Sequence, residues 1–436
     1  MPDPNRSLLR HPDFLKLWVG ETVSVFGSQV TQLAVPLIAA TVLNVTAFEF
    51  GLLNTIEMLP FILLSLPAGV WVDRLRRRPI MIVADLGRAA AIATIPLAFA
   101  LNGLTIWQLY VVGGIVGCFT VFFDVAYQSY LPSIVDRDQL VEGNGKLEIT
   151  RSASQILGPG MAGILIGVLE APFAMVLDAL SYLWSASFVA WIRRPEPPVE
   201  PHDEARHGPK PSMRSEMASG LRYVVGHRWL RSIAATTGLS NLFTGISGAI
   251  LVLYLVRDRG LSAEQIGITF SVGSVGVLLA ALATSAITRR VGLGRMLVTS
   301  AFGFSIAGLL IPIAPDEVIM PAVAASGFVM GFAGVSWNIN QVSLRQAITP
   351  QRMQGRMNAS MRFIVWGTIP LGSIGGGALG SLIGLHQTIW VGAIGGLVAF
   401  VPVALSPVRA IREMPTATET GDGASPAPEP EVPTAG

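Results

Sequence analysis

Long apolar segments recur along this chain, and they constrain its fold more than any other feature. A helix that crosses the hydrocarbon core of a bilayer needs about 20 mostly apolar residues. Twelve segments meet that requirement, and most connections between them are so short that neighbouring helices must run antiparallel. The predicted spans are 13–43, 49–72, 79–101, 105–131, 145–169, 171–192, 230–256, 263–288, 295–314, 317–344, 355–383 and 387–405.

The composition agrees with a fold embedded in lipid. Charged residues make up 13% of the chain, whereas soluble domains contain about 25%. Hydrophobic residues reach 51%, which is more apolar surface than a soluble protein of this size can hide. The single cysteine, Cys118, excludes a disulfide scaffold, and the sequence has no zinc-ligand spacing and no P-loop. We therefore expect an all-α integral membrane protein that is not an enzyme and takes no metal, cofactor or nucleic acid.

Basic residues indicate the orientation of the helices. If the N-terminus is cytosolic, the short outer loops contain only Arg257 and Arg259 of the 30 lysines and arginines. Cytosolic loops of membrane proteins carry an excess of Lys and Arg, so both termini are expected in the cytosol, in a multi-pass protein of the cytoplasmic membrane. An odd number of helices would spoil this pattern.

The longest inner connection divides the twelve helices into six and six. It contains the sequence PEPPVEP and a mixed-charge run, typical of a solvated linker, with a surface helix near 212–226. The tail has almost no large apolar residue and is expected to be disordered. The predicted organisation is a cytosolic N-terminus (1–12), a six-helix bundle (13–192), a cytosolic linker (193–229), a second bundle (230–406) and a disordered tail (407–436).

The fifth helix of each half begins in the same way. An arginine is followed eight residues later by a proline, Arg151 by Pro159 and Arg362 by Pro370. Small residues let helices approach closely in lipid, and Pro beside Gly makes a helix easy to bend. These helices are therefore either static packing faces or bendable, moving parts. Their glycines are Gly158, Gly160, Gly163 and Gly167 in one, and Gly372, Gly376, Gly380 and Gly384 in the other.

A charged motif, GVWVDRLRRRP, starts at Gly69 between the second and third helices. Arginines alone would indicate only topology, but Asp73 lies four residues before Arg77 and so shares its side of a helical end. Here the chain resembles the major facilitator superfamily, whose motif at this place reads Gly-x-x-x-Asp-Arg-x-Gly-Arg-Arg. The resemblance covers 13–405 and implies two six-helix bundles related by a pseudo-twofold axis. It also implies that the fifth helix of each half meets helices of the other half, so we expect the stripe that contains Gly376 to lie at that contact.

Other segments resemble one branch of that superfamily, the drug:proton antiporters that include macrolide-efflux and siderophore (enterobactin) exporters. Arg76 replaces the usual glycine of the motif, as is common in that branch. Further similarities are His11-Pro12-x-Phe14, Gly20-x-x-x-Ser24-x-x-Gly27, Ala84-Asp85-x-x-Arg88-Ala89 and Gly158-Pro159-x-x-x-Gly163. Helix four lacks the intramembrane arginine that many proton antiporters carry. The resemblance implies a latch at the inner gate in the outward-open state, made by Gly69, Asp73, Arg74, Arg77, Arg78 and Asp124.

Ionisable groups inside lipid are costly, so each one is a functional candidate. Asp85 with Arg88, and Glu148 with Arg151, are three residues apart near the inner surface, and we interpret them as structural ion pairs. Asp124 is expected near the inner end of helix four, level with Asp73. The second half has no acid within a span. A carboxylate that carries protons must therefore be one of Glu21, Glu57, Asp124 and Asp178.

Glu21 begins a polar stripe on the first helix. It lies about eight residues into that helix, roughly 12 Å deep at 1.5 Å per residue. Ser28, Gln29 and Gln32 continue the same face, and the resemblance implies that this helix lines a central cavity. Glu57 and Asp178 lie in the outer thirds of their helices. Each could bind a proton or a cationic substrate, or could reach the outer surface.

The second half offers uncharged polar groups that are either cavity hydrogen-bonders and stacking surfaces or contacts between helices. These are Asn241, Trp337, Asn338, Asn340, Gln341 and Trp366.

The sequence therefore predicts a secondary transporter that works by alternating access. We expect proton-coupled export of amphipathic small molecules, similar to drugs, macrolides or siderophores, by a monomer whose partners are its substrate, protons and the bilayer. An uptake permease or a lysophospholipid flippase on the same fold is the alternative.

Overall fold

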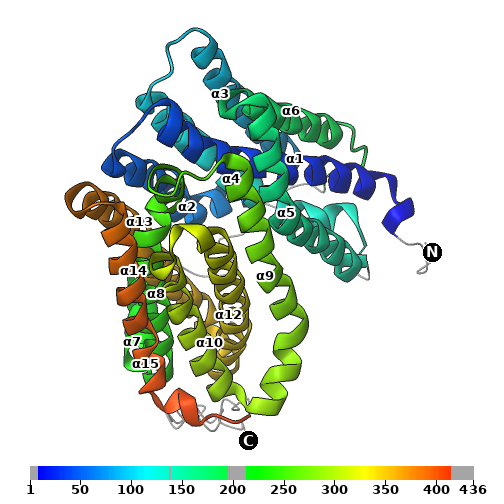
Figure 1. Cartoon of the computed structure of the whole chain (residues 1–436). Helices are drawn as coiled ribbons and strands as arrows, with labels where there is room; N and C mark the ends of the chain where they lie inside the picture. Colours follow the sequence, from blue (N-terminus) through cyan, green and yellow to red (C-terminus); the bar gives the residue numbers. More distant parts are fainter. Residues whose placement is uncertain (1–7, 137–138, 195, 197–212, 414–436) are drawn as a thin grey trace, which may run out of the picture.

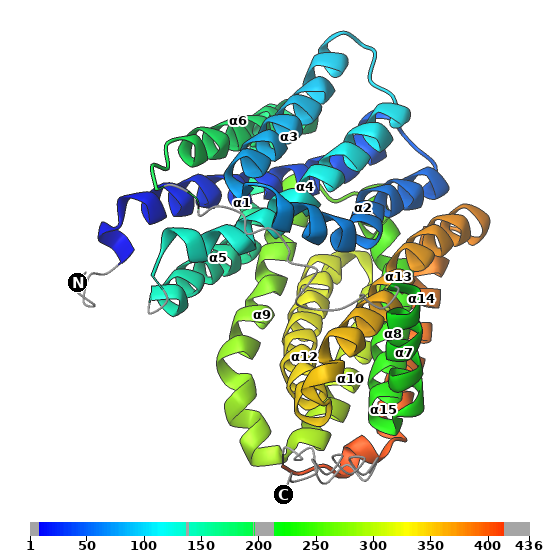
Figure 2. The same cartoon turned by 180° about the vertical axis from the view of Figure 1, so that it is seen from behind.

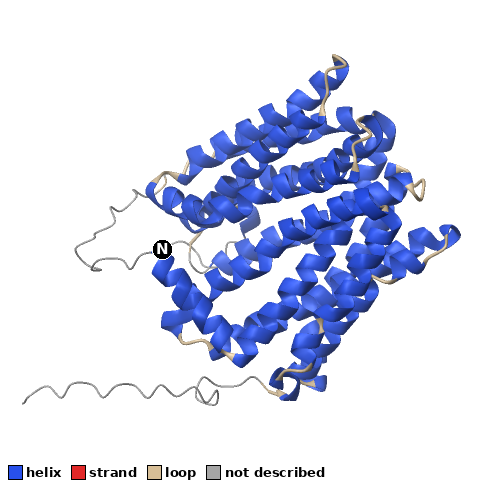
Figure 3. Ribbon diagram, turned by 90° about the vertical axis from the view of Figure 1, so that its left-hand side faces the viewer, coloured by secondary structure: helices blue, strands red, loops and turns tan. Residues whose placement is uncertain are grey.

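The computed structural model describes residues 8–136, 139–194, 196 and 213–413, and these residues form helices joined by short loops (Figure 3). They include twelve helical spans long and apolar enough to cross a membrane, as predicted. The first six spans are α1 (Pro12–Leu37) with its π-helical extension η2 (Ile38–Val42), α2 (Ala47–Arg74), α3 (Arg77–Ala100), α4 (Ile106–Ile134), α5 (Leu140–Leu169) and α6 (Ala171–Ala190). The second six are α8 (Arg228–Arg257), α9 (Ala263–Val291), α10 (Leu293–Ala307) with α11 (Leu310–Ile313), α12 (Ile319–Ile348), α13 (Gln351–Ile383), and α14 (Leu385–Ala399) with α15 (Val401–Ala404).

Local sequence signals define where several helices begin and end. Thr46 caps α2 by accepting a hydrogen bond from the Glu49 backbone N–H at 3.2 Å, and the Glu49 carboxylate accepts one from the Thr46 N–H at 2.8 Å. Gly384 adopts φ 91° between α13 and α14, a backbone conformation that favours glycine. Gly384 therefore ends α13 and does not continue its glycine stripe.

The spans form the two predicted six-helix bundles, α1–α6 and α8–α15, which are inclined to each other in Figures 1 and 2. Across the interface α2 contacts α13, and α5 contacts α9. The second helix of each bundle thus meets the fifth helix of the other, as a pseudo-twofold axis requires.

Buried apolar clusters show where the bundles are joined. One cluster combines residues of both bundles, such as Leu37 and Ile38 with Leu253 and Tyr254. At the other end each bundle has its own cluster. We call the joined end, near residues 43–46, 258–262 and 384, the closed end. The other end is the arginine-rich end, which carries Arg77, Arg78, Arg193, Arg194, Arg289, Arg290 and Arg295.

Hydrogen bonds also cross between the bundles toward the closed end. The Gly160 N–H donates to Ser271 Oγ at 2.7 Å, and the Phe48 N–H donates to Ser381 Oγ at 3.0 Å. Arg257 Nη2 donates at 3.1 Å to the carbonyl of Ala40, which lies in the π-helical turn η2. These polar contacts and the shared apolar cluster hold the two bundles together at this end.

The surface helix expected near 212–226 is present as α7 (Met213–Gly226), which packs on α13. Residues 407–413 differ from the prediction that disorder begins at 407. They form the short helix η6 (Pro407–Ala410) and continue to Ile411, whose carbonyl accepts a hydrogen bond from the Gly294 N–H at 2.7 Å. Val408 is fully buried, so apolar burial holds this segment on α10. The rest of the tail and most of the linker lie outside the described residues.

Candidate functional site: a polar cavity in the first bundle

A cavity of about 930 Å³ lies along the first bundle. Its described lining residues come from α1 to α6 and range from Val35 and Leu109, toward the closed end, to Asn144 and Glu148, near the arginine-rich end. The polar stripe on α1 is part of this wall. Its members in the lining are Glu21, Ser28, Gln29 and Gln32.

Glu21 contributes to this wall a buried polar atom without a partner in the described part of the chain. Its Oε2 atom is buried and has no hydrogen-bond partner among the described residues. The charged groups that act on it electrostatically are Arg88, Asp85 and Asp124. A carboxylate in such surroundings either takes up a proton or needs a cation close by.

The predicted ion pair of Arg88 with Asp85 is confirmed, but its predicted place near the inner surface is wrong. Arg88 lies eleven residues into α3, about 16 Å from its start at 1.5 Å per residue. Its guanidinium lies between the rings of Phe123 and Tyr182, 4.3 and 4.2 Å from their centroids, and it lines the cavity. The sequence shows the three-residue spacing but not the rings, which come from α4 and α6.

Asp178 and Glu57 take different positions. Asp178 is fully buried and accepts hydrogen bonds from Thr31 Oγ1 on α1 and from Ser181 Oγ, the latter at 3.1 Å. The interpretation that Asp178 reaches the outer surface is therefore wrong. Glu57 lines the cavity, where its Cγ lies 3.0 Å from the point at which a Cβ on Gly113 would sit.

Asp124 is exposed to the cavity, and it lies deeper than predicted. It is ten residues, or about 15 Å, from the end of α4 at Ile134, so it is not level with Asp73. The cations that act on it are Arg88 and Arg151.

The predicted ion pair of Glu148 with Arg151 is wrong. Both side chains line the cavity, and no salt bridge joins them among the described residues. A spacing of three residues permits such a pair, but each of these groups faces open space instead.

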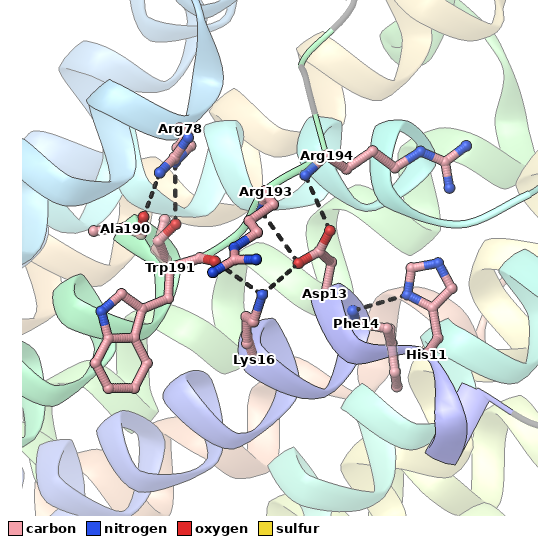
Figure 4. Close-up of polar contacts among 10 residues, drawn as sticks. His11, Asp13, Phe14, Lys16, Arg78, Ala190, Trp191, Arg193 and Arg194 are labelled. Carbon is pink, nitrogen blue, oxygen red and sulfur yellow. Dashed lines mark hydrogen bonds and ion pairs between the residues drawn. The ribbon is translucent and has the colours of Figure 1, made fainter.

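The motif arginines bind the end of α6 and the segment after it, as Figure 4 shows for Arg78. Arg78 Nε donates to the carbonyl of Val189 at 3.1 Å, and Arg77 pairs with Glu196 at 3.5 Å. A Cβ on Gly69 would meet nothing within 4 Å. The side chains of Asp73 and Arg74 lie outside the described part of the chain, so the latch stays a prediction.

The His-Pro-x-Phe segment is a helix start that also anchors α6 (Figure 4). His11 Nδ1 accepts a hydrogen bond from the Phe14 N–H at 3.1 Å and so caps α1. The Asp13 carboxylate accepts from the N–H groups of Arg193 and Arg194 at 3.2 and 3.0 Å. The segment thus ties the start of α1 to the residues that follow α6. These contacts give the His-Pro-x-Phe pattern a structural role.

Polar groups of the second half make hydrogen bonds within their own bundle. Trp337 Nε1 donates to Thr237 Oγ1 at 3.1 Å, and Thr288 Oγ1 donates to Asn340 Oδ1 at 3.1 Å. Gln341 Nε2 donates to Asn338 Oδ1 at 3.0 Å, and Asn241 Nδ2 donates to the Val365 carbonyl at 2.8 Å. The contacts of Trp337, Asn340 and Asn241 each join two helices, which favours the interpretation that these groups hold helices together. The hydrogen bond of Gln341 with Asn338 lies within α12.

The first glycine-rich helix meets the other bundle as predicted. A Cβ on Gly163 would lie 2.6 Å from the Ala263 carbonyl oxygen of α9, and the Pro159 carbonyl faces Gly267 of the same helix. Gly158 packs instead on Gln29 of its own bundle.

The second glycine-rich helix does not use the predicted face. Gly372 and Gly376 pack on the α8 carbonyls of Leu242 and Ile246, within the second bundle, although Pro370 lies inside α13 as expected. The contact with α2 is made by Gly377, where a Cβ would lie 2.8 Å from the Ala47 carbonyl oxygen. The prediction that Gly376 meets the other half is therefore wrong, because a bare stripe does not reveal which neighbour fills it.

Known proteins share both the sequence pattern and the fold. The chain is 26% identical over 394 residues to the multidrug efflux pump Tap of Mycolicibacterium fortuitum, covering 87% of this chain and 91% of that protein. A bacterial homologue of the iron transporter ferroportin in its inward-facing state superposes with a TM-score of 0.70 at 17% identity, covering 92% of this chain and 99% of that one. A bacterial homologue of ferroportin in its outward-facing state superposes with a TM-score of 0.56 at 18% identity, covering 90% of this chain and 98% of that one.

The family model described as "Transmembrane secretion effector" matches residues 5–432, nearly the whole chain. Twelve spans in two bundles, with a cavity among the helices of the first bundle, agree with that match. The chain belongs to the transmembrane secretion effector family of major facilitator superfamily transporters.

Proposed function

We propose that this transporter exports amphipathic small molecules, similar to drugs, macrolides or siderophores, in exchange for protons. The observation that carries the proposal is Glu21, a carboxylate with an unpartnered buried oxygen in the wall of a large cavity. The same wall offers apolar side chains such as Val35 and Leu109 and the amides of Gln29 and Gln32. An amphipathic molecule matches this mixture, and the relationship to a multidrug efflux pump supports the same substrate class.

The orientation that we propose for the chain defines the side of the membrane to which the cavity opens. Loops rich in arginine favour the cytosol, so we place the arginine-rich end there, with both termini. The closed end then faces outward, and the cavity is accessible from the cytosol in this conformation. A monomer in the cytoplasmic membrane would collect its substrate from the cytosol and the inner leaflet.

The transport cycle follows from two exclusive conformations. In the present one, the bundles are joined by α2 with α13 and α5 with α9 at the closed end. Opening that end and joining the bundles at the other would expose the cavity to the outside, where proton binding at Glu21 displaces the substrate. Return with the proton bound would reset the transporter. The proton gradient is the energy source, and no cofactor enters this cycle.

A resistance panel tests the substrate class. A strain that lacks the gene is exposed to toxic amphipathic compounds and siderophores, with and without the gene on a plasmid. Protection against a group of amphipathic compounds, abolished by dissipating the proton gradient, is the expected result. Protection that persists without the gradient, or a growth requirement for a nutrient in place of resistance, would contradict the proposal.

A further inference from the structure

The charges around the cavity are unequal. Four carboxylates lie within electrostatic reach of Arg88 or of each other, whereas the cations among these described groups are Arg88 and Arg151. The titratable groups that interact electrostatically with Glu21 or Arg88 are Asp85 on α3, Asp124 and Tyr127 on α4, and Asp178 and Tyr182 on α6. Further charged groups of the cavity wall are Glu57 on α2 and Glu148 and Arg151 on α5.

The surroundings of Arg88 fix the position of its guanidinium but leave an N–H donor without a partner in the described part of the chain. The residue is 4% exposed, and its guanidinium is enclosed by the rings of Phe123 and Tyr182. Arg88 Nη2 binds Asp85, whereas Arg88 Nε has no hydrogen-bond partner among the described residues. A guanidinium keeps its proton and offers five N–H donors in a rigid fork, so it can serve two carboxylates in turn.

Glu21 lines the same cavity as Arg88, and each of them has a buried polar atom without a hydrogen-bond partner among the described residues. The buried Oε2 of Glu21 receives no hydrogen bond from the described residues, and Arg88 is the cation among them that acts on it. Two acids, Asp85 and Glu21, therefore share one cation. When both are ionised the group carries one excess negative charge in a poorly solvated site, and one proton removes it.

We infer that Arg88 is a positioning residue for proton binding at Glu21, a shared counter-ion that moves from Asp85 toward Glu21 when Glu21 loses its proton. The inference rests on the proposed proton coupling for its role in transport. The chemistry at the site is simple: the Glu21 carboxylate gains or loses one proton, and Arg88 stays protonated throughout.

Labelling with dicyclohexylcarbodiimide tests this role without any substrate. The reagent modifies protonated carboxyl groups in apolar surroundings, and mass spectrometry quantifies the adduct on the peptide that contains Glu21. Purified protein in detergent is labelled over a series of pH values, and the pH of half-maximal labelling is recorded. Glu21→Gln identifies the adduct, because that variant cannot form it.

Two variants should shift the half-maximal pH in opposite directions. Asp85→Asn/Arg88→Gln removes the ion pair as a neutral unit and takes the cation from Glu21, so the value should rise by about 1–3 pH units. Asp85→Asn alone leaves Arg88 free to serve Glu21, so the value should fall. A loss of structure would not shift the half-maximal pH of these two variants in opposite directions.

The matched control is Arg151→Gln, which removes the other cavity cation that acts on Asp124. It should leave the labelling of Glu21 unchanged, whereas Arg88→Lys, which keeps the charge, should stay near the wild-type value. An unchanged value in the double variant, or an equal rise in Arg151→Gln, would overturn the inference. Because the assay contains no substrate, a failed export proposal would not affect it. Expected shifts without proton-driven transport would contradict the proposed function alone.

Discussion

An alanine at Gly163 should weaken the closed end of the transporter. Its Cβ would lie 2.6 Å from the Ala263 carbonyl oxygen and 3.1 Å from the Gly267 Cα. Both atoms belong to the backbone of α9 in the other bundle, so they cannot rotate away. The contact can be relieved only by moving α5 and α9 apart.

The expected magnitude follows from the cost of overpacking, about 1–3 kcal/mol for an extra carbon in a packed interface. The close approach of α5 to α9 is part of the closed end. The substitution should therefore destabilise the conformation in which this end is closed. Since 1.4 kcal/mol is a factor of about ten, the equilibrium should move about 5- to 150-fold toward opening.

Cysteine accessibility measures this shift. In a Cys118→Ser background, one reporter is Asn144→Cys, which lines the cavity near the arginine-rich end. The other is Ser373→Cys, a buried position where α13 contacts α2. With Gly163→Ala, labelling by a membrane-impermeant maleimide should rise at position 373 and fall at position 144.

The chain offers a matched control in Gly376→Ala. Its added Cβ would overlap the Ile246 carbonyl oxygen, which lies on α8 of the same bundle. This variant should lower the thermal stability without changing the ratio of the two labels. If Gly163→Ala loses stability while both reporters stay unchanged, the α5–α9 contact has no role in gating.

Three further changes test separate contacts. Thr31→Val removes the hydroxyl that donates to the Asp178 carboxylate, so it should cost about 1–3 kcal/mol of stability in thermal denaturation. Arg257→Gln removes the hydrogen bond to the Ala40 carbonyl. That loss of about 0.5–1.5 kcal/mol should increase maleimide labelling at the closed end. Unchanged labelling would show that this hydrogen bond does not help to keep the end closed. Asp73→Asn should abolish transport in everted vesicles at near-normal expression, whereas normal efflux would reduce the motif to a topology signal.

The features that could be predicted from the sequence are those set by the residues of a single helix. Span lengths follow from the thickness of the bilayer, and the stripe that begins at Glu21 follows from helical periodicity. Both are present, with Glu21 and Gln32 in the cavity wall. The split into two bundles followed from the one long connection.

Features that depend on several helices could not be predicted in the same way. The spacing of Asp85 and Arg88 indicated a pair but could not show that Phe123 and Tyr182 would enclose the guanidinium. Depth was also misjudged for Asp124, because the end of α4 lies further along the chain than expected. Similarly, Gly376 was assigned to the wrong neighbour, since a side-chain-free face fits any close helix.

The most direct test of the central claim is substrate accumulation in everted vesicles that contain wild-type protein or Glu21→Gln. The substrate is the panel compound to which the gene gives the greatest resistance, and an imposed pH gradient drives uptake. A carboxylate can exchange a proton, whereas the amide of Gln cannot. We predict gradient-driven accumulation by the wild type, and in Glu21→Gln a loss of this accumulation with substrate binding largely kept. Wild-type accumulation by Glu21→Gln under the same gradient would contradict the assignment of proton coupling to Glu21.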